Sequence, residues 1–284
     1  MSYQIVDCNH LGPERLTSAM NAAFSDYVVP LSMTVEAFRD FQKQRGFSDR
    51  HSFVALEGEE IAAFWFSGSP SPAYDNRAYT LSVGTCPKHR RKGLSRQLLE
   101  AVIEVQRSDA ASGLQLEVVS TNAKAIKAYE AFGFVSTRKL RVCKLKTTGL
   151  IASNPGGVEF TTLNVDELPE DETGYFDTVP TPQNSRSALI GLAETTQIIG
   201  AWHGDDLVGW GAVFRDGAVA QIGVRKDRRR SGVGQAILFQ LAERAGTEQL
   251  TFVNIDESAT GINAFLNQAG AEDILQQFEM HLTL

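Results

Sequence analysis

The sequence predicts an α+β protein built from two tandem copies of one unit, each a mixed, mostly antiparallel twisted sheet with flanking helices. Three pairs of similar stretches, in the same order and 137 to 146 residues apart, predict the duplication. These pairs are HRRKGLSRQLL (89–99) with RRRSGVGQAIL (228–238), LEGEEIAAFW (56–65) with WHGDDLVGWG (202–211), and NAKAIKAYEAFGF (122–134) with ATGINAFLNQAGA (259–271).

The chain length agrees with two copies, because 284 residues suffice for two domains that each bury a core. Gly, Ser, Asn and Pro gather in TTGLIASNPGG (147–157), a composition typical of a linker. We therefore predict a first domain over 1–148, a linker over 149–158 and a second domain over 159–284.

Apolar spacing near 3.6 residues predicts helices, and short apolar runs bounded by turn residues predict strands. In the first copy the predicted strands are 3–7, 52–66 (a hairpin), 77–85, 114–120 and 137–145, and the predicted helices are 13–24, 34–46, 93–108 and 122–133. In the second copy the predicted strands are 197–203, 207–214, 218–224, 250–255 and 276–284, and the predicted helices are 232–246 and 261–270.

Composition excludes several classes of function. The net charge is -7, divided into about +4 over residues 1–150 (19 Lys and Arg against 15 Asp and Glu) and about -11 over 151–284 (8 against 19). An acidic second half without aromatic residues among its cations argues against nucleic-acid binding. No apolar run approaches the roughly 18 residues that span a membrane, and the N-terminus lacks the pattern of a secretory signal.

Cysteine and histidine usage predicts neither a disulfide framework nor a metal site. The three cysteines have spacings that suit no zinc site, and the five histidines form no HExxH motif. We therefore expect a reduced, cytoplasmic compartment and no metal cofactor.

The repeated basic stretch lies between a strand and the start of a helix in both copies. A helix N-terminus carries partial positive charge and unpaired N–H groups, so additional cations there are favourable only beside an anion. Glycine lets a backbone approach the anion closely, and arginine neutralises its charge. These loops therefore predict a phosphate or diphosphate site.

Familiar phosphate and nucleophile motifs do not fit these loops. Neither copy contains GxxxxGK[ST], Ile237 stands where a GxGxxG fingerprint needs its third glycine, and Gln97 stands where GxSxG needs its last. What remains is Arg-x-x-Gly-x-Gly/Ser between strand and helix. From these residues alone, another phosphate ligand such as a nucleotide stays open.

Together with the hairpin and the later helix ending in Gly-Phe, this loop resembles the GCN5-related N-acetyltransferase (GNAT) superfamily, in tandem, over nearly the whole chain. The resemblance implies that the loop holds the diphosphate of acetyl-CoA or another acyl-CoA, without a metal. In the first copy it assigns this role to Arg90, Arg91, Lys92, Gly93, Leu94, Ser95 and Arg96. In the second copy it assigns the role to Arg229, Arg230, Ser231, Gly232, Val233 and Gly234. Ser95 departs from the family's usual Gly or Ala.

The same resemblance implies further roles in the first copy. The end of the strand at Gly84 and Thr85 is expected to pair with the pantetheine arm of the donor. Asn122 and Tyr129 match family positions that contact CoA, and they are two helical turns apart, on one helix face. A phenol is suited to protonate a departing thiolate, so Tyr129 is the candidate general acid; packing against Phe132 and Phe134 is the alternative.

The candidate acid and base occur in one copy only. At an offset of 137, Asn122 corresponds to Ala259, Tyr129 to Leu266 and Glu117 to Asn254. Glu117, on the strand before the helix, is the candidate general base, and a solvated strand edge is its alternative role. We therefore predict that the N-terminal copy is catalytic and the C-terminal copy degenerate.

By resemblance, Asp26 and Tyr27 lie where the family shapes the acceptor pocket. The predicted activity is direct transfer of an acetyl group from acetyl-CoA to an amine, the acceptor being a small molecule or a peptide rather than a nucleic acid or a membrane. Two alternatives stay open at this point. One is an acyl-CoA-binding module without turnover, and the other is activity in the C-terminal copy.

Overall fold

The computed structural model describes residues 2–26, 32–153 and 155–284, and the chain forms two compact units. The first unit comprises Met1–Glu117, Lys124–Thr137 and Met280–Leu284, and the second comprises Val118–Ala123 and Arg138–Glu279. The units are therefore interleaved along the chain, whereas the domains predicted from the repeat are continuous segments. In the described part of the chain, no helix is long and apolar enough to cross a membrane.

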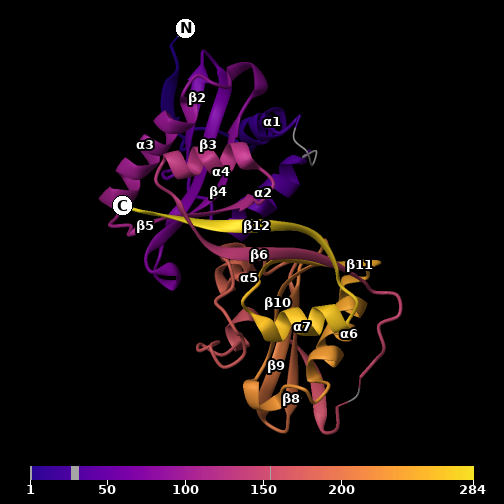
Figure 1. Cartoon of the computed structure of the whole chain (residues 1–284). Helices are drawn as coiled ribbons and strands as arrows, with labels where there is room; N and C mark the ends of the chain where they lie inside the picture. The colour runs from indigo at the N-terminus through magenta and orange to yellow at the C-terminus, as the bar shows by residue number, and fades with distance from the viewer. Residues whose placement is uncertain (1, 27–31, 154) are drawn as a thin grey trace. The chain divides into compact units, whose positions relative to one another are not determined.

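The first half of the chain follows the predicted order of elements (Figure 1). Its strands are β1 (Gln4–Asp7), β2 (Phe53–Glu57), β3 (Glu60–Ser71), β4 (Arg77–Thr85), β5 (Gly113–Val119) and β6 (Val135–Lys146). Its helices are α1 (Pro13–Ala23), α2 (Val35–Arg45), α3 (Leu94–Ser108) and α4 (Ala123–Ala131). Local signals set these bounds: the Thr34 side chain caps the start of α2, and Gly46 ends it in the left-handed conformation.

The sheet of the first unit has the strand order β1-β2-β3-β4-β5-β12. Strands β1 to β4 pair antiparallel, but β4 and β5 pair parallel, and only from Arg77–Tyr79 to Gly113–Gln115. The last strand, β12 (Glu272–Thr283), reaches this unit with its C-terminal end, where Leu284 donates its N–H to the Ser112 carbonyl across 3.0 Å. Gly113 has no room for a side chain because the Leu282 carbonyl lies against it.

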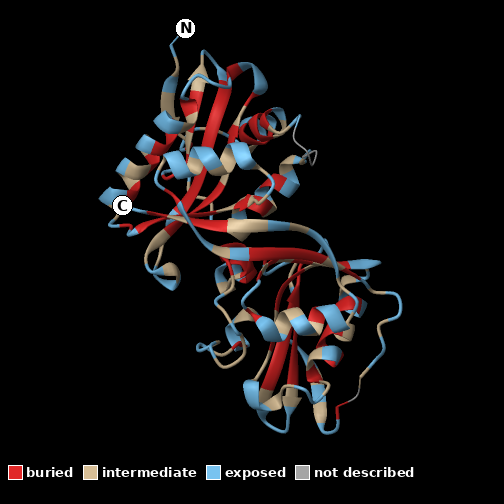
Figure 2. Ribbon diagram, viewed as in Figure 1, coloured by how far each residue is buried: buried red, intermediate tan, exposed pale blue. Residues whose placement is uncertain are grey.

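The core of the first unit lies on both faces of β3 and β4. Phe38 of α2 packs against Phe66 of β3, together with buried residues of α1. On the other side, α3 packs against β2, β3 and β4, and Trp65 is fully buried beside Phe134. Figure 2 shows the buried residues running along these central strands. Helices on both faces hold the central strands in place.

The second half repeats this order, with one short helix between its first two strands where the first half has α1 and α2. It contains two elements beyond those that the sequence patterns predicted. Its elements are β7 (Val158–Leu163), α5 (Arg186–Gly191), β8 (Gln197–His203), β9 (Asp206–Val213), β10 (Ala218–Val224), α6 (Val233–Ala245), β11 (Gln249–Asp256), α7 (Thr260–Gln268) and β12. The two additions are β7 and α5. Turn-rich sequence around them, and the shortness of α5, explain why periodicity missed them.

The sheet of the second unit has the strand order β12-β6-β11-β10-β9-β8-β7. Strands β10 and β11 pair parallel at only two positions, Ala218 with Thr251 and Val219 with Phe252. The neighbouring pairs β6–β11, β9–β10, β8–β9 and β7–β8 are antiparallel. A mostly antiparallel sheet with flanking helices, as predicted, is therefore confirmed for each unit.

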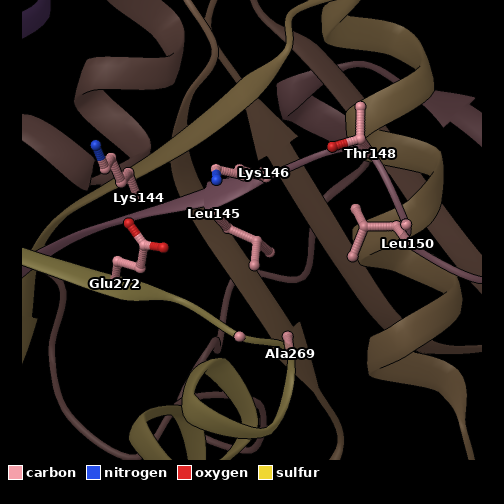
Figure 3. Close-up of a pocket in the computed structure, with 9 residues that line it drawn as sticks. Lys144, Leu145, Lys146, Thr148, Leu150, Ala269 and Glu272 are labelled. Carbon is pink, nitrogen blue, oxygen red and sulfur yellow. The ribbon is translucent and has the colours of Figure 1, made fainter.

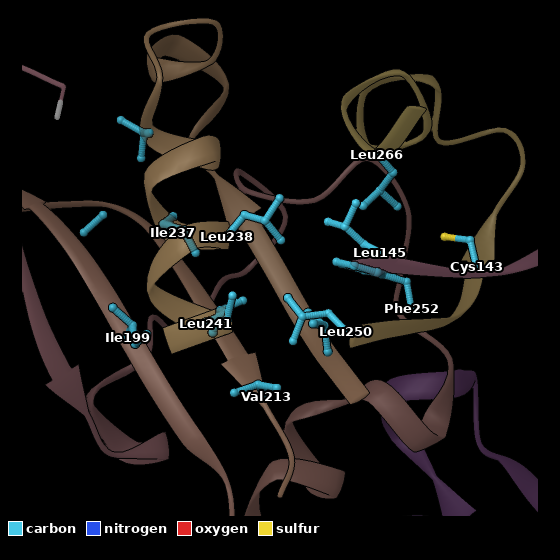
Figure 4. Packing of buried hydrophobic residues seen from close by; sticks show 14 of the residues in the cluster. Cys143, Leu145, Ile199, Val213, Ile237, Leu238, Leu241, Leu250, Phe252 and Leu266 are labelled. Atoms are coloured by element: carbon cyan, nitrogen blue, oxygen red, sulfur yellow. The ribbon is translucent and has the colours of Figure 1, made fainter. Parts of the chain in front are cut away.

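Strand β6 belongs largely to the second unit, although its sequence precedes the predicted linker. Its residues pair with β11 from Leu140 to Lys146, and Cys143 and Leu145 are buried in the second core with Leu250 and Phe252 (Figure 4). Ile237 of α6 lies in the same cluster. The apolar face of β6 is thus covered by residues more than 90 positions later in the chain, a pairing that a local pattern cannot predict.

Candidate functional site

The first basic loop links β4 to α3 through a short 3₁₀ turn, Pro87–His89. Two residues of the loop have left-handed backbone conformations, Arg91 with a φ of 61° and Gly93 with a φ of 75°. Helix α3 begins directly after Gly93, so the N–H groups of Leu94 and Ser95 have no acceptor within the helix, whereas Arg96 donates its N–H to the Gly93 carbonyl across 3.2 Å. Successive residues whose φ angles alternate in sign, followed by the start of a helix, form a concave row of N–H donors suited to an anion.

The space above Gly93 is open among the residues that the structure describes. Apart from Gly93 and its two chain neighbours, no described atom lies within 4 Å of the position that a Cβ at this residue would occupy. Two loop cations are held at the sides: Lys92 donates to the Tyr3 hydroxyl across 2.6 Å, and the Arg96 guanidinium lies 5.3 Å from the centre of the Phe132 ring. The loop therefore presents an accessible backbone with cations around it.

Beside this loop, β4 and β5 diverge. Their pairing stops at Tyr79 and Gln115, so the following residues of both strands, up to Thr85 on β4, have separated edges. Gly84 lies at the diverging end, where an added Cβ would meet the Phe64 ring and Ala23. An extended ligand arm can pair with the freed edge of a strand.

Arg90 lies at the loop, as predicted, and its guanidinium contacts three parts of the first unit. Nη1 and Nη2 donate to the two oxygens of Asp26 across 2.7 and 2.6 Å. Nε donates to the Thr85 carbonyl across 3.1 Å, and Nη2 also donates to the Ala23 carbonyl across 3.1 Å. The side chain therefore joins the end of β4 to the end of α1.

Asp26, a predicted acceptor residue, is the carboxylate partner in this arrangement. The hydrogen bond from Arg90 lowers the pKa of Asp26 below its ordinary value, and the nearby charge of Lys124 at the start of α4 lowers it further. Asp26 is thus ionised and paired. Tyr27, the other predicted acceptor residue, lies outside the residues that the structure describes.

Glu117 is half-buried on β5, next to the point where the strands diverge. The Tyr79 hydroxyl of β4 donates to its Oε2 across 2.5 Å. Burial first, and then the charge of Glu117, raises the pKa of Tyr79 well above its ordinary value. Arg45, at the end of α2, also hydrogen-bonds Tyr79. The phenol therefore stays protonated and holds an oriented carboxylate.

Tyr129 is half-buried in the last turn of α4. Its ring makes edge contacts with Trp65 and Phe134, at centroid distances of 6.2 and 5.6 Å. Asn122 directly precedes α4 and donates its N–H to the Val119 carbonyl across 2.8 Å. The aromatic contacts fix the direction of the phenol, and they satisfy the packing role that the sequence also allowed.

The second basic loop has the same backbone. Arg230 and Gly232 have φ values of 59° and 87°, and α6 begins directly after Gly232. Here, however, the Ser153 hydroxyl lies 2.9 Å from the position of a Cβ on Gly232. Gln235 of α6 also donates to the Ile151 carbonyl across 3.5 Å. The segment predicted as a linker thus lies over the second loop.

The gap between β10 and β11 is filled by the chain itself. Asn184 donates from its side chain to the Val253 carbonyl of β11 across 2.7 Å, and its own carbonyl accepts from Gln221 of β10 across 3.1 Å. Thr181 accepts a hydrogen bond from Asn254, the counterpart of Glu117, across 3.4 Å. These residues are buried, so a segment of this unit occupies the position between its diverging strands.

Several of these residues were missed by sequence reasoning. Asp177 contacts Arg229 as Asp26 contacts Arg90, and the paired stretches FSD (24–26) and YFD (175–177) are a signal for it. Tyr79 carries no such signal, because a tyrosine in an apolar strand predicts only packing. The same is true of Asn184, whose partners are 37 and 69 residues away.

The pocket drawn in Figure 3 does not coincide with either loop. It has a volume of about 180 Å³ and lies between the end of β6 and the end of α7, with Lys144, Lys146 and Glu272 around it. Among the residues that the structure describes, no group of three or more His, Cys, Asp or Glu side chains could hold a metal ion.

Two segments of the chain, residues 16–134 and 161–270, each match the Acetyltransferase (GNAT) family. Together they cover more than half of the sequence, so the chain belongs to this family, and the resemblance drawn from its loops is confirmed. A solved structure of a tandem GNAT protein from the clavulanic acid biosynthesis pathway has a TM-score of 0.72. It is 15% identical, and the match covers 99% of this chain and 98% of that one, which shows a common fold.

Two curated relatives match parts of the chain. Streptothricin acetyltransferase of Streptomyces lavendulae is 34% identical over 87 residues, which is 31% of this chain and 46% of that protein. Mycothiol acetyltransferase of Brachybacterium faecium is 29% identical over 122 residues, which is 42% of this chain and 37% of that protein. The chain thus spans less than half the length of each curated relative.

Proposed function

We propose that the protein is an acyl-CoA-dependent N-acyltransferase that moves an acetyl group from acetyl-CoA to an amine, and that its N-terminal copy is catalytic. The observation that carries this proposal is the difference between the two copies. In the first, the loop at Gly93 is open beside diverging strands. In the second, Ser153 covers the loop and Asn184 fills the gap between the strands.

The donor fits the residues of the first copy. The row of N–H groups from Arg91 to Ser95 binds the diphosphate, with Arg91, Lys92 and Arg96 supplying positive charge. The edge of β4 that ends at Thr85 pairs with the pantetheine arm, and Asn122 contacts the donor at the start of α4. The left-handed conformation of Gly93 supports this assignment, since a side chain there would be strained and would project into the same space.

The chemistry requires one group that accepts a proton and one that donates a proton. Glu117 accepts a proton from the ammonium form of the acceptor. The neutral nitrogen then forms a bond to the acetyl carbonyl carbon and releases a second proton to solvent. The bond between that carbon and sulfur breaks, and Tyr129 donates its proton to the sulfur. Glu117 returns its proton to Tyr129 through solvent, so protons balance over the cycle. A backbone N–H near the diverging ends of β4 and β5 stabilises the oxygen of the reacting carbonyl.

The acceptor is an amine on a small molecule or a peptide. The names of the two curated relatives, streptothricin acetyltransferase and mycothiol acetyltransferase, favour the small-molecule class. Binding lies on the face of the sheet where Glu117, Tyr79 and Arg45 meet, because this face carries the proposed base.

Matched glycine variants test which copy binds the donor. Gly93→Ala and Gly232→Ala introduce the same side chain into a left-handed backbone, with a backbone strain of about 1–2 kcal/mol in each. At Gly232 the Ser153 side chain must also move, because its hydroxyl lies 2.9 Å from the new Cβ. We expect calorimetric titration of acetyl-CoA to find one site per chain, which Gly93→Ala weakens and Gly232→Ala leaves intact. Binding lost only through Gly232→Ala would assign the donor to the C-terminal copy.

Turnover separates an enzyme from a binding module. Release of free thiol from acetyl-CoA, followed with a panel of amines, reports transfer directly. We expect Tyr129→Phe to lower kcat by about a hundredfold while leaving acetyl-CoA binding unchanged. Binding without thiol release from any amine would instead favour an acyl-CoA-binding module.

A further inference from the structure

Each copy contains the same arginine arrangement at its basic loop. In the first, Arg90 contacts Asp26 through both oxygens and also the carbonyls of Thr85 and Ala23. In the second, Arg229 contacts Asp177 across 2.5 Å and the carbonyls of Val224 and Tyr175 across 3.1 and 3.0 Å. We call each arrangement an arginine clamp.

The two clamps join equivalent places in the two units. Thr85 and Val224 are the last residues of β4 and β10. Ala23 ends α1, and Tyr175 lies in the segment that packs against β10 at Gly223. Asp26 lies near Lys124 of α4, and Asp177 contacts Gly261 of α7. Each clamp therefore links the end of the central strand to the segment before the first hairpin.

The surroundings of the two clamps differ, whereas the partners of the arginine are of the same kind. In each clamp these are an aspartate, the carbonyl that ends the strand and a carbonyl of the segment before the hairpin, although Arg90 bonds both oxygens of Asp26 and Arg229 bonds one oxygen of Asp177. The first loop is open and the second is covered by Ser153. If the arginine served as a diphosphate ligand, its contacts would be expected to differ between an open and a covered loop. Instead, the Arg90 guanidinium uses four of its five N–H donors on protein oxygens.

We infer that Arg90 is a positioning residue and not a ligand of the diphosphate, and that Asp26 holds it in place. This inference rests on the proposed function. The clamp fixes the end of β4, where the donor arm pairs, relative to the end of α1, on the acceptor side. The diphosphate is left to the backbone of the loop and to its neighbouring cation Arg91, which is exposed.

A truncated donor distinguishes a clamp from a ligand. S-acetyl-pantetheine has the thioester and the arm of acetyl-CoA but no diphosphate. We expect Arg90→Ala to lower kcat/KM by about ten- to a hundredfold with both donors, because the strand end is misplaced in both cases. The control is Arg91→Ala, which we expect to lower kcat/KM with acetyl-CoA and to leave S-acetyl-pantetheine unaffected.

A charge exchange provides the second readout. The double variant Arg90→Asp with Asp26→Arg keeps the ion pair in reverse, and we expect it to recover part of the activity that either single variant loses. A diphosphate ligand replaced by aspartate would repel the donor, and the exchange would restore nothing. The inference is overturned if Arg90→Ala lowers kcat/KM with acetyl-CoA but not with S-acetyl-pantetheine. It is also overturned if the folded double variant recovers no activity.

Failure of the proposed function gives a different result. If the wild-type chain transfers no acetyl group, the same variants are compared by calorimetric binding of CoA and of pantetheine. Equal weakening of both ligands by Arg90→Ala still supports the clamp. Weakening of CoA alone still overturns it. The two hypotheses are therefore tested separately.

Discussion

The Tyr79 hydroxyl donates a hydrogen bond to the Glu117 carboxylate across 2.5 Å, between the two strands that diverge in the first unit. Tyr79 is only 7% exposed, and Glu117 is half-buried. The hydrogen bond joins a phenol whose pKa is raised well above its ordinary value, by burial first, to the Glu117 carboxylate. This pair orients the proposed base and also makes the unit sensitive to alkaline pH.

The raised pKa of Tyr79 predicts a loss of stability at high pH. Because its folded-state pKa lies above the unfolded value near 10, the unfolded chain releases the proton first as the pH rises. The contribution of protonated Tyr79 to the free energy of unfolding is present below about pH 10. Above that pH it is lost, at most at about 1.4 kcal/mol per pH unit. Thermal unfolding of wild type and Tyr79→Phe between pH 8.5 and 11, a range set by the tyrosine reference pKa, checks this expectation. Their Tm difference should shift in favour of the variant above about pH 10, and a constant difference would contradict it.

Removal of the Glu117 charge should slow the reaction. We expect Glu117→Gln to lower kcat by about a hundredfold at neutral pH, since the glutamine keeps the shape but cannot accept the proton. The deficit should shrink at alkaline pH, where the acceptor amine is already deprotonated in solution. The matched control is Glu130→Gln on the exposed side of α4, with the same change of charge. An equal loss at every pH would point to a structural role for Glu117.

The residue that fills the gap in the second unit should matter for stability and not for catalysis. Asn184→Ala leaves the Val253 carbonyl without its side-chain donor, and we expect a loss of about 1–3 kcal/mol in the free energy of unfolding. Acetyl transfer by the folded variant should be unchanged. Gln268→Ala, at an exposed amide of α7, is the control and should change stability by less than about 0.5 kcal/mol. Loss of transfer in folded Asn184→Ala would place the reaction in the second unit.

A buried ion pair in the second unit should be costly to break. Arg138 of β6 donates to both oxygens of Glu279 on β12, across 3.0 and 2.5 Å, and to Asp256 of β11 across 3.4 Å. Burial would lower the pKa of Arg138, but the two carboxylates more than offset it, and the net shift is upward. We expect Arg138→Met to lower the free energy of unfolding by about 3–5 kcal/mol, because the buried Glu279 carboxylate loses both hydrogen bonds and the charge of Arg138.

Urea unfolding measures the effect of the Arg138 variant. The control is Arg244→Met on the exposed face of α6, whose expected change is below about 0.5 kcal/mol. A small effect for Arg138→Met would mean that water reaches Glu279 and solvates its charge.

The elements and the position of the two basic loops at helix starts could be predicted from the sequence because their signals are local. The spacing of Leu94, Leu98 and Val102 defines α3, and the repeated Arg-x-x-Gly places both loops at helix starts. The left-handed backbone of Gly93 and of Gly232 follows from the same stretch of chain. These features depend on contacts within a few residues, which the order of residues alone determines.

What only the tertiary structure decided depends on distant partners. Strand β6 lies with β11 because the second core covers Cys143 and Leu145. The sequence pattern predicts Arg90 as a phosphate ligand, but its guanidinium is hydrogen-bonded to Asp26, 64 residues away. Ser153 covers the loop at Gly232, whereas no described residue covers the loop at Gly93 in this way. The partner of a side chain depends on which distant residues the folded backbone places beside it. A local residue pattern does not specify those residues.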